Sequence, residues 1–97
     1  MYMTVRHYRV PLDKVEELAR RVDDDWLEKV RKLPGFVSYH VIDAEDDHIV
    51  SVTTFLDEET GKQAAEASSE WIGEHLSDIP HKFVEMRQGR VIIHGGA

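Results

Sequence analysis

Residues 34–56 decide the fold of this chain and read PGFVSYHVIDAEDDHIVSVTTFL. Two runs rich in β-branched and aromatic residues, 36–42 and 48–56, flank the acidic connection 43–47. Two such runs joined by a short polar connection predict an antiparallel hairpin. The connection lacks the glycine and the spaced ligands of a calcium loop, so we interpret it as a solvated turn.

A helix is predicted on each side of this hairpin. Apolar residues recur every three or four positions over 12–33, which is typical of an amphipathic helix that ends at Pro34 and Gly35. After the hairpin, Asp57 is a suitable N-cap for a second helix that runs to about Ile79. The stripe of the first helix consists of Leu12, Val15, Leu18, Ala19, Val22, Trp26, Val30 and Leu33.

The first and last strands are predicted at the two ends of the chain. Residues 2–10 alternate and stop at Pro11, and 83–94 form a last strand in which Gly89 is expected to make a bulge or kink. The order strand, helix, strand, strand, helix, strand predicts a ferredoxin-like βαββαβ sandwich of the α+β class. We therefore expect a four-stranded antiparallel sheet in a single domain over 1–97.

Composition narrows the range of partners. The 97 residues carry 12 Lys plus Arg against 19 Asp plus Glu, a net charge of -7, which repels a phosphate backbone and argues against nucleic acid. There is no cysteine, so disulfides and thiolate metal sites are excluded. No stretch has the length of a membrane span or the apolar core of a signal peptide. The expectation is a soluble, cytoplasmic protein.

Apolar residues on both faces of the predicted sheet indicate that the protein assembles. Two helices cover one face only, and the cheapest cover for the other face is a second copy of the same sheet. We therefore expect a homodimer with Val50, Val52 or their neighbours at its interface. The apolar strand residues in question are Met3, Val5, Tyr8, Val10, Ile49, Val50, Val52 and Phe55.

The second helix carries the candidate site. At about 100° per residue, His75 lies on its inward half one turn after Trp71, beyond the small residues Ala64, Ala67 and Ser68. Small side chains leave space between helix and sheet, and Trp26 of the first helix faces the same region. This pattern predicts a cavity for a flat organic molecule, with His75 as catalytic base and Trp71 as stacking wall. The alternative is that these residues are ordinary core.

The remaining binding candidates come from the strands and from Ser68. Arg6 and Tyr8 share one face of the first strand and His7 and Arg9 the other, so at least one basic side chain faces a covered side. A buried cation needs a carboxylate or a ligand anion. The substrate-binding candidates are therefore Trp26, Arg6, His7, Tyr39, His40 and Ser68, although the faces of Tyr39 and His40 are not assigned by the sequence.

No metal site is expected. The pairs His75/His81 and His40/His48 lack the spacing that brings two imidazoles onto one metal.

The residues also resemble a known family. The run MYMTVRHYRV, the segment KLPGFVSYHVIDAEDDHIVSVTTFLDEETG and the helix end EWIGEHL are similar to the antibiotic biosynthesis monooxygenases, which are dimeric α/β barrels. The resemblance extends from about Met1 to His94, and its most specific element is Pro34-Gly35-Phe36 followed by Phe55. It implies the dimeric barrel fold, whereas activities in the family include oxygenation, haem degradation and isomerisation.

Family motifs carry over only in part. The haem-degrading branch uses an asparagine on its first strand, where this chain has Arg6 and His7, and the chain contains no asparagine. Trp71 and His81 are spaced like that branch's tryptophan and histidine, with Pro80 intervening. In the polyketide-oxidising branch an asparagine precedes the helix tryptophan by one turn, and here that position is Ala67.

The leading hypothesis is a cofactor-independent monooxygenase acting on an electron-rich phenol, quinol or polyketide-type ring, with dioxygen as co-substrate. A deprotonated substrate of this kind supplies the first electron to dioxygen, so the protein needs a base, an aromatic cradle and a dry pocket. The alternative is a non-catalytic dimer that binds a small molecule or is structural. Haem binding is a third possibility.

Overall fold

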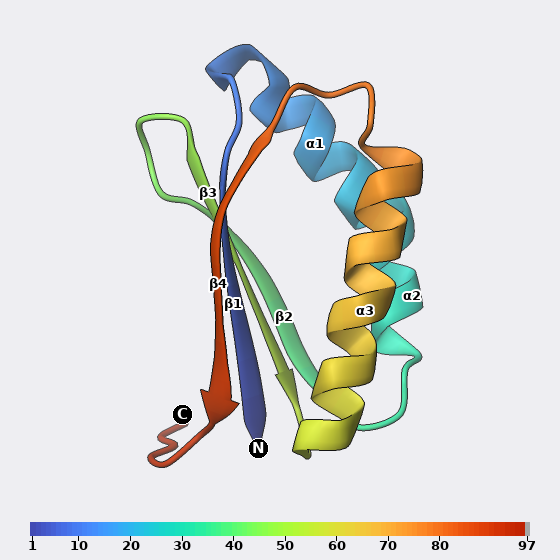
Figure 1. Ribbon diagram of the computed structural model, residues 1–97, viewed down its shortest axis with the longest axis vertical. Helices are drawn as coiled ribbons and strands as arrows, with labels where there is room; N and C mark the ends of the chain where they lie inside the picture. Colours follow the sequence, from blue (N-terminus) through green and yellow to red (C-terminus); the bar gives the residue numbers. More distant parts are fainter. Residues whose placement is uncertain (97) are drawn as a thin grey trace.

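The computed structural model describes residues 1–96 as a four-stranded sheet with all helices on one face (Figure 1). Strands β1 (Tyr2–Arg9), β2 (Phe36–Asp43), β3 (His48–Phe55) and β4 (Lys82–Arg90) are antiparallel in the order β2-β3-β1-β4. The predicted ferredoxin-like α+β architecture is confirmed. The first three strands begin and end within one residue of the expected positions.

The hairpin turn is held by its own acidic residues. The Asp43 carboxylate accepts a hydrogen bond from the Glu45 backbone N–H at 3.1 Å, and the Asp47 carbonyl accepts from Val10 N–H at 2.8 Å. Glu45, Asp46 and Asp47 all have φ between 50° and 67°, a region that Asp tolerates better than most residues. The turn therefore connects β2 to β3 and also fixes the end of β1.

The first helix is not uniform, contrary to expectation. A 3₁₀ turn (Leu12–Lys14) leads into α1 (Val15–Arg21), a π-helical turn (Val22–Trp26) and α2 (Leu27–Arg31). The buried residues Leu18, Val22, Trp26 and Val30 are each four apart, a spacing that drifts by about 40° per step in a regular α-helix. The wider π turn, in which Leu27 N–H bonds to the Val22 carbonyl, offsets this drift and keeps Trp26 and Val30 on the core side.

Helix α3 (Glu58–His75) starts as predicted and ends earlier than predicted. The Asp57 side chain caps its start by accepting from Thr60 N–H at 2.9 Å. Its last residue is His75, not Ile79, because Leu76 leaves the helical conformation at φ -118°. The segment from Leu76 to His81 is then free to cross from the helix layer back to the sheet.

Strand β4 is shorter than the expected 83–94. Its partner β1 begins at Tyr2, so beyond the bond from Val91 N–H to the Met1 carbonyl no neighbouring strand remains to pair with. The bulge expected at Gly89 is wrong, since Gly89 pairs regularly with Met3. The irregularity lies at Val84, where the β1 register shifts between His7 and Tyr8.

The two faces of the sheet have different cover. The β1 residues Tyr2, Thr4 and Arg6 are buried under the helices, and α3 crosses over β1 and β3. No helix lies on the opposite face in the part of the chain that the structure describes (Figure 1). By register that bare face carries Val5 opposite Val52 and His7 opposite Val50, as the dimer hypothesis requires.

Every residue of β4 is exposed, including Phe83, Val84 and Met86. Within residues 1–96, no helix combines the length and the apolar character needed to cross a bilayer.

Candidate functional site

A partly enclosed cavity of about 50 Å³ lies between the sheet and the helices. Its walls include four large aromatic side chains, Tyr8 and Tyr39 from the sheet and Trp26 and Trp71 from the helices. An engineered apolar cavity of about 150 Å³ binds benzene, so this smaller cavity has room for a few waters and not for a ring system. Aliphatic residues and Ser51, Ser68 and His81 complete its lining.

A larger groove of about 600 Å³ runs between α3 and β4 and is open to solvent. Tyr8, Ile72 and His81 line both the groove and the cavity, so they form the boundary between the two spaces. The groove exists because α3 lies over β1 and β3 and leaves β4 uncovered. Its other lining residues are Arg6, Lys62, Ala65, Glu66, Ser69, Phe83, Met86 and Gln88.

The two tryptophans form the helix-side wall. Their ring centroids are 5.9 Å apart, and the Trp71 indole N–H donates to Asp25 Oδ2 at 2.8 Å. This bond, with help from Lys29 at 3.2 Å, holds the pKa of Asp25 below its ordinary value. Asp25 belongs to the π turn, so the turn places the carboxylate that orients the Trp71 ring.

Two tyrosines face the tryptophans from the sheet. Burial raises the pKa of Tyr39 above its ordinary value, and the neighbouring Tyr8 acts in the same direction. Tyr39 is therefore a neutral phenol at physiological pH. The Tyr8 hydroxyl accepts a hydrogen bond from Arg6 Nη1 at 3.3 Å.

His81 stands at the boundary between cavity and groove. Its Nδ1 lies 2.8 Å from the Ile79 carbonyl oxygen, which can only accept, so Nδ1 carries the proton of the neutral ring. Nε2 is then an unprotonated acceptor. The ring meets Tyr8 edge to face with centroids 6.1 Å apart, and the residue remains exposed on its groove side.

An ion pair fixes the segment that carries His81. Arg21 of α1 donates to both carboxylate oxygens of Asp78, at 2.6 and 2.9 Å, and to the His75 carbonyl oxygen at 2.9 Å. The Arg21 guanidinium lowers the pKa of Asp78 to about 2. These contacts join the end of α3 to α1 and position the approach to β4.

His75 lies outside the cavity, contrary to its expected inward placement. Its side chain is 41% exposed and stacks on the outer surface of Trp71 with centroids 5.0 Å apart. Its Nε2 is 3.9 Å from Asp25 Oδ2 and 3.8 Å from Glu74 Oε2. The helical wheel gave the correct side of α3, but that side faces the π turn and solvent at this level.

The other sequence candidates divide between the two faces of the sheet. Trp26, Tyr39 and Ser68 line the cavity, and Arg6 lines the groove. His7 and His40 lie on the bare face, opposite Val50 and Val52, and they line neither the cavity nor the groove. His7 Nε2 instead meets His48 Nδ1 at 2.6 Å, and among the described residues no third ligand completes a metal site there.

The sequence indicated His81 only through its spacing from Trp71 in the haem-degrading branch, and it placed Tyr8 on the Arg6 face of the first strand without naming it as a binding residue. His81 follows Pro80 in an irregular segment, where no periodicity indicates a direction. The sequence signal for Tyr8 was its position on the same strand face as Arg6. This position places a phenol beside the one basic residue of that face.

The topology and the one-sided helix layer define a ferredoxin-like α+β protein. No protein-family model matches the chain, and no curated protein matches its sequence. Solved structures match in shape, and their identities, all below 25% here, show the fold alone. By this likeness the chain has the fold of the antibiotic biosynthesis monooxygenases, as the sequence resemblance implied.

Three of these structures span almost the whole chain. A monooxygenase from the gene ActVA-Orf6 of Streptomyces coelicolor, in complex with Nanaomycin D, is 21% identical with a TM-score of 0.71 and covers 98% of this chain and 92% of its own. A protein assigned as an antibiotic biosynthesis monooxygenase from Nitrosomonas europaea is 16% identical, with a TM-score of 0.72 and coverages of 96% and 100%. The heme-degrader MhuD from Mycobacterium tuberculosis is 16% identical, with a TM-score of 0.79 and coverages of 99% and 100%.

Proposed function

We propose that this protein is a cofactor-independent monooxygenase for a small, electron-rich aromatic molecule such as a phenol or quinol. The observation that carries the proposal is His81, which lines both the cavity and the groove and whose Nδ1 contacts the Ile79 carbonyl, so that Nε2 is the acceptor nitrogen of the neutral ring. The monooxygenases that share the fold support the same reaction class.

The chemistry requires little beyond this base. His81 Nε2 takes the proton of a ring hydroxyl, and the resulting phenolate transfers an electron to dioxygen more readily than the phenol does. In the overall reaction a phenol and O₂ give a quinone and water: one oxygen atom replaces the ring hydrogen as a carbonyl, and the other leaves as water. The substrate supplies all the electrons, so no external reductant is needed.

The ring is expected to bind in the groove, because the cavity is too small for it. Its reacting edge would point past Tyr8 toward His81 and the tryptophan pair. The cavity behind them has the size of a site for dioxygen or water. The cavity is also too small for a porphyrin.

We also propose that the protein acts as a homodimer. The bare sheet face carries Val5, Val50 and Val52, and β4 exposes apolar side chains such as Phe83 and Met86. With about 25 cal/mol per Å² for apolar burial, covering a face of a few hundred Å² contributes several kcal/mol to a small domain. A second copy that covers this face and the exposed β4 would also reduce water access to the groove.

The test is oxygen uptake with a panel of phenols, naphthols and quinols under air. We expect turnover that falls at least about a hundredfold in His81→Ala, in line with the usual effect of a general base. The matched control is His75→Ala, which removes a histidine on the solvent side of Trp71 and should retain turnover.

If His75→Ala loses turnover while His81→Ala retains it, His75 and not His81 is the catalytic base. A protein whose tryptophan fluorescence is quenched by these phenols, and which consumes no dioxygen, would instead be the non-catalytic binder.

A further inference from the structure

Arg6 is a buried cation without an acidic partner. The residue is 7% exposed, and its guanidinium donates to the Ala65 carbonyl at 2.6 Å, to Ser69 Oγ at 3.1 Å and to the Tyr8 hydroxyl at 3.3 Å. All three acceptors are neutral. Within residues 1–96, the arginines that pair with carboxylates are Arg9, Arg20, Arg21, Arg31 and Arg87.

This arrangement is unfavourable for the protein taken alone. Arginine does not lose its proton in a protein, so Arg6 cannot escape the cost of burial by becoming neutral. A buried charge is ordinarily compensated by an opposite charge, and neutral acceptors replace only part of the lost hydration. The guanidinium has five N–H groups, and the three bonds leave about two of them, including Nε–H, without a protein partner. No fully buried side-chain nitrogen among the described residues lacks a hydrogen bond, so Nε is accessible from outside. These observations indicate that an anion completes the site.

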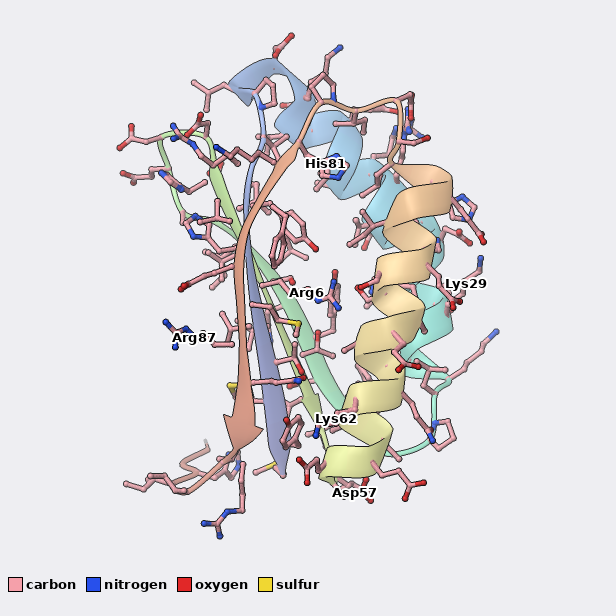
Figure 2. The ribbon with its side chains drawn as sticks, viewed as in Figure 1. Arg6, Lys29, Asp57, Lys62, His81 and Arg87 are labelled. Carbon is pink, nitrogen blue, oxygen red and sulfur yellow. The ribbon has the colours of Figure 1, made fainter. Side chains whose placement is uncertain are left out.

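The groove gives such an anion access to Arg6. Arg6 and Ser69 form part of its lining, and Lys62 and Glu66 stand along the same groove. Lys62 is paired with Glu58 at 2.9 Å and is half exposed, so Arg6 is the cation with no carboxylate bound to it. Figure 2 shows the Arg6 side chain extending from the sheet toward α3, in the space between the two layers.

We propose that the groove binds a planar aromatic molecule that carries an anionic group, held by Arg6, with its ring extending toward His81. Guanidinium N–H groups bind a carboxylate in a planar, two-point geometry, which fixes the direction of the attached ring. Tyr8 spans the distance between the two residues, because its hydroxyl contacts Arg6 and its ring contacts the His81 ring. A molecule of one or two rings therefore reaches both ends. This inference rests on the proposed function for the role of the groove and adds the substrate class.

The test compares two probes of equal shape, 2-naphthoate and its neutral amide 2-naphthamide, by titration calorimetry under argon. Neither probe has a phenolic hydroxyl, so binding is measured without turnover. We expect 2-naphthoate to bind the unmodified protein at least about tenfold more tightly, the usual advantage of a hydrogen bond to a charged group. In Arg6→Gln the two probes should bind within about threefold of each other.

Two further variants separate binding from folding. Arg6→Lys keeps the charge and should retain part of the preference for 2-naphthoate. Arg31→Gln removes an exposed arginine, with the same change in net charge, and should retain all of it. Circular dichroism spectra and melting curves of each variant establish that it is folded before titration.

Equal affinities for the two probes in the unmodified protein, or no binding of either at millimolar concentration, would overturn the anion site. So would a preference that survives in folded Arg6→Gln. If the preference depends on Arg6 while no phenol or quinol supports oxygen uptake, the anion site stands and the monooxygenase proposal fails. If oxygen uptake depends on His81 and the preference for 2-naphthoate is absent, the monooxygenase proposal stands and the anion site fails.

Discussion

Replacing the two glycines of α3 by alanine should have opposite effects on stability. A Cβ added at Gly61 would lie 2.7 Å from Tyr2 Cδ2, closer than Cβ atoms approach other atoms in proteins, and 3.4 Å from Tyr2 Cγ. A Cβ added at Gly73 would meet nothing within 4 Å. Gly61 thus lies at a close approach of α3 to the Tyr2 side chain of β1.

The magnitudes follow from two competing terms. Alanine in a helix interior is favoured over glycine by about 0.5–1 kcal/mol, so Gly73→Ala should stabilise by that amount and raise the melting temperature by about 2–8 °C. Gly61→Ala gains the same term, but it overpacks against a buried tyrosine at a cost of about 1–3 kcal/mol. Its net effect should range from near zero to a loss of about 2.5 kcal/mol.

The assay is urea denaturation followed by circular dichroism, with all variants at the same protein concentration because dimerisation would make stability concentration-dependent. The double variant Tyr2→Ala/Gly61→Ala supplies the control, since removing the ring should abolish the penalty for the added methyl group. Equal stabilisation by Gly61→Ala and Gly73→Ala would refute the close approach of α3 to β1.

Three other outcomes are expected. Val52→Lys places a charge on the bare sheet face and should abolish both dimer and fold in sedimentation equilibrium, whereas a stable, folded wild-type monomer at low micromolar concentration would contradict the dimer proposal. Arg21 lowers the pKa of Asp78 to about 2 from an ordinary 3.8, so their contact stabilises the fold above pH 3.8 and is lost as the pH falls toward 2. In Asp78→Asn the melting temperature should therefore change less with pH in that window than in the wild-type protein. An equal pH dependence in the two proteins would show that the contact contributes nothing to stability. Titration with hemin should give no Soret shift that depends on His81. A shift seen with the wild-type protein and lost in His81→Ala would restore the haem hypothesis.

Local patterns in the sequence were sufficient for the architecture. The alternation in 36–42 and 48–56, interrupted by 43–47, predicted the hairpin because side chains of a strand alternate between faces whatever lies beyond them. The same alternation put Arg6 and Tyr8 on one face and His7 on the other. Burial of one of these basic residues, and its need for an anion, could therefore be stated before the fold was known.

Tertiary structure alone decided where the candidate site lies. A helical wheel assigns His75 to a side of α3, but only the packing of α3 against the π turn shows that this side meets Asp25 and solvent at its last turn. His81 lies in an irregular segment whose direction is set by the Arg21 contacts with Asp78, 57 residues away in sequence. Periodicity is a property of regular backbone and carries no information about what stands opposite a side chain, so the base, the groove and the neutral surroundings of Arg6 emerge only when distant elements are packed together.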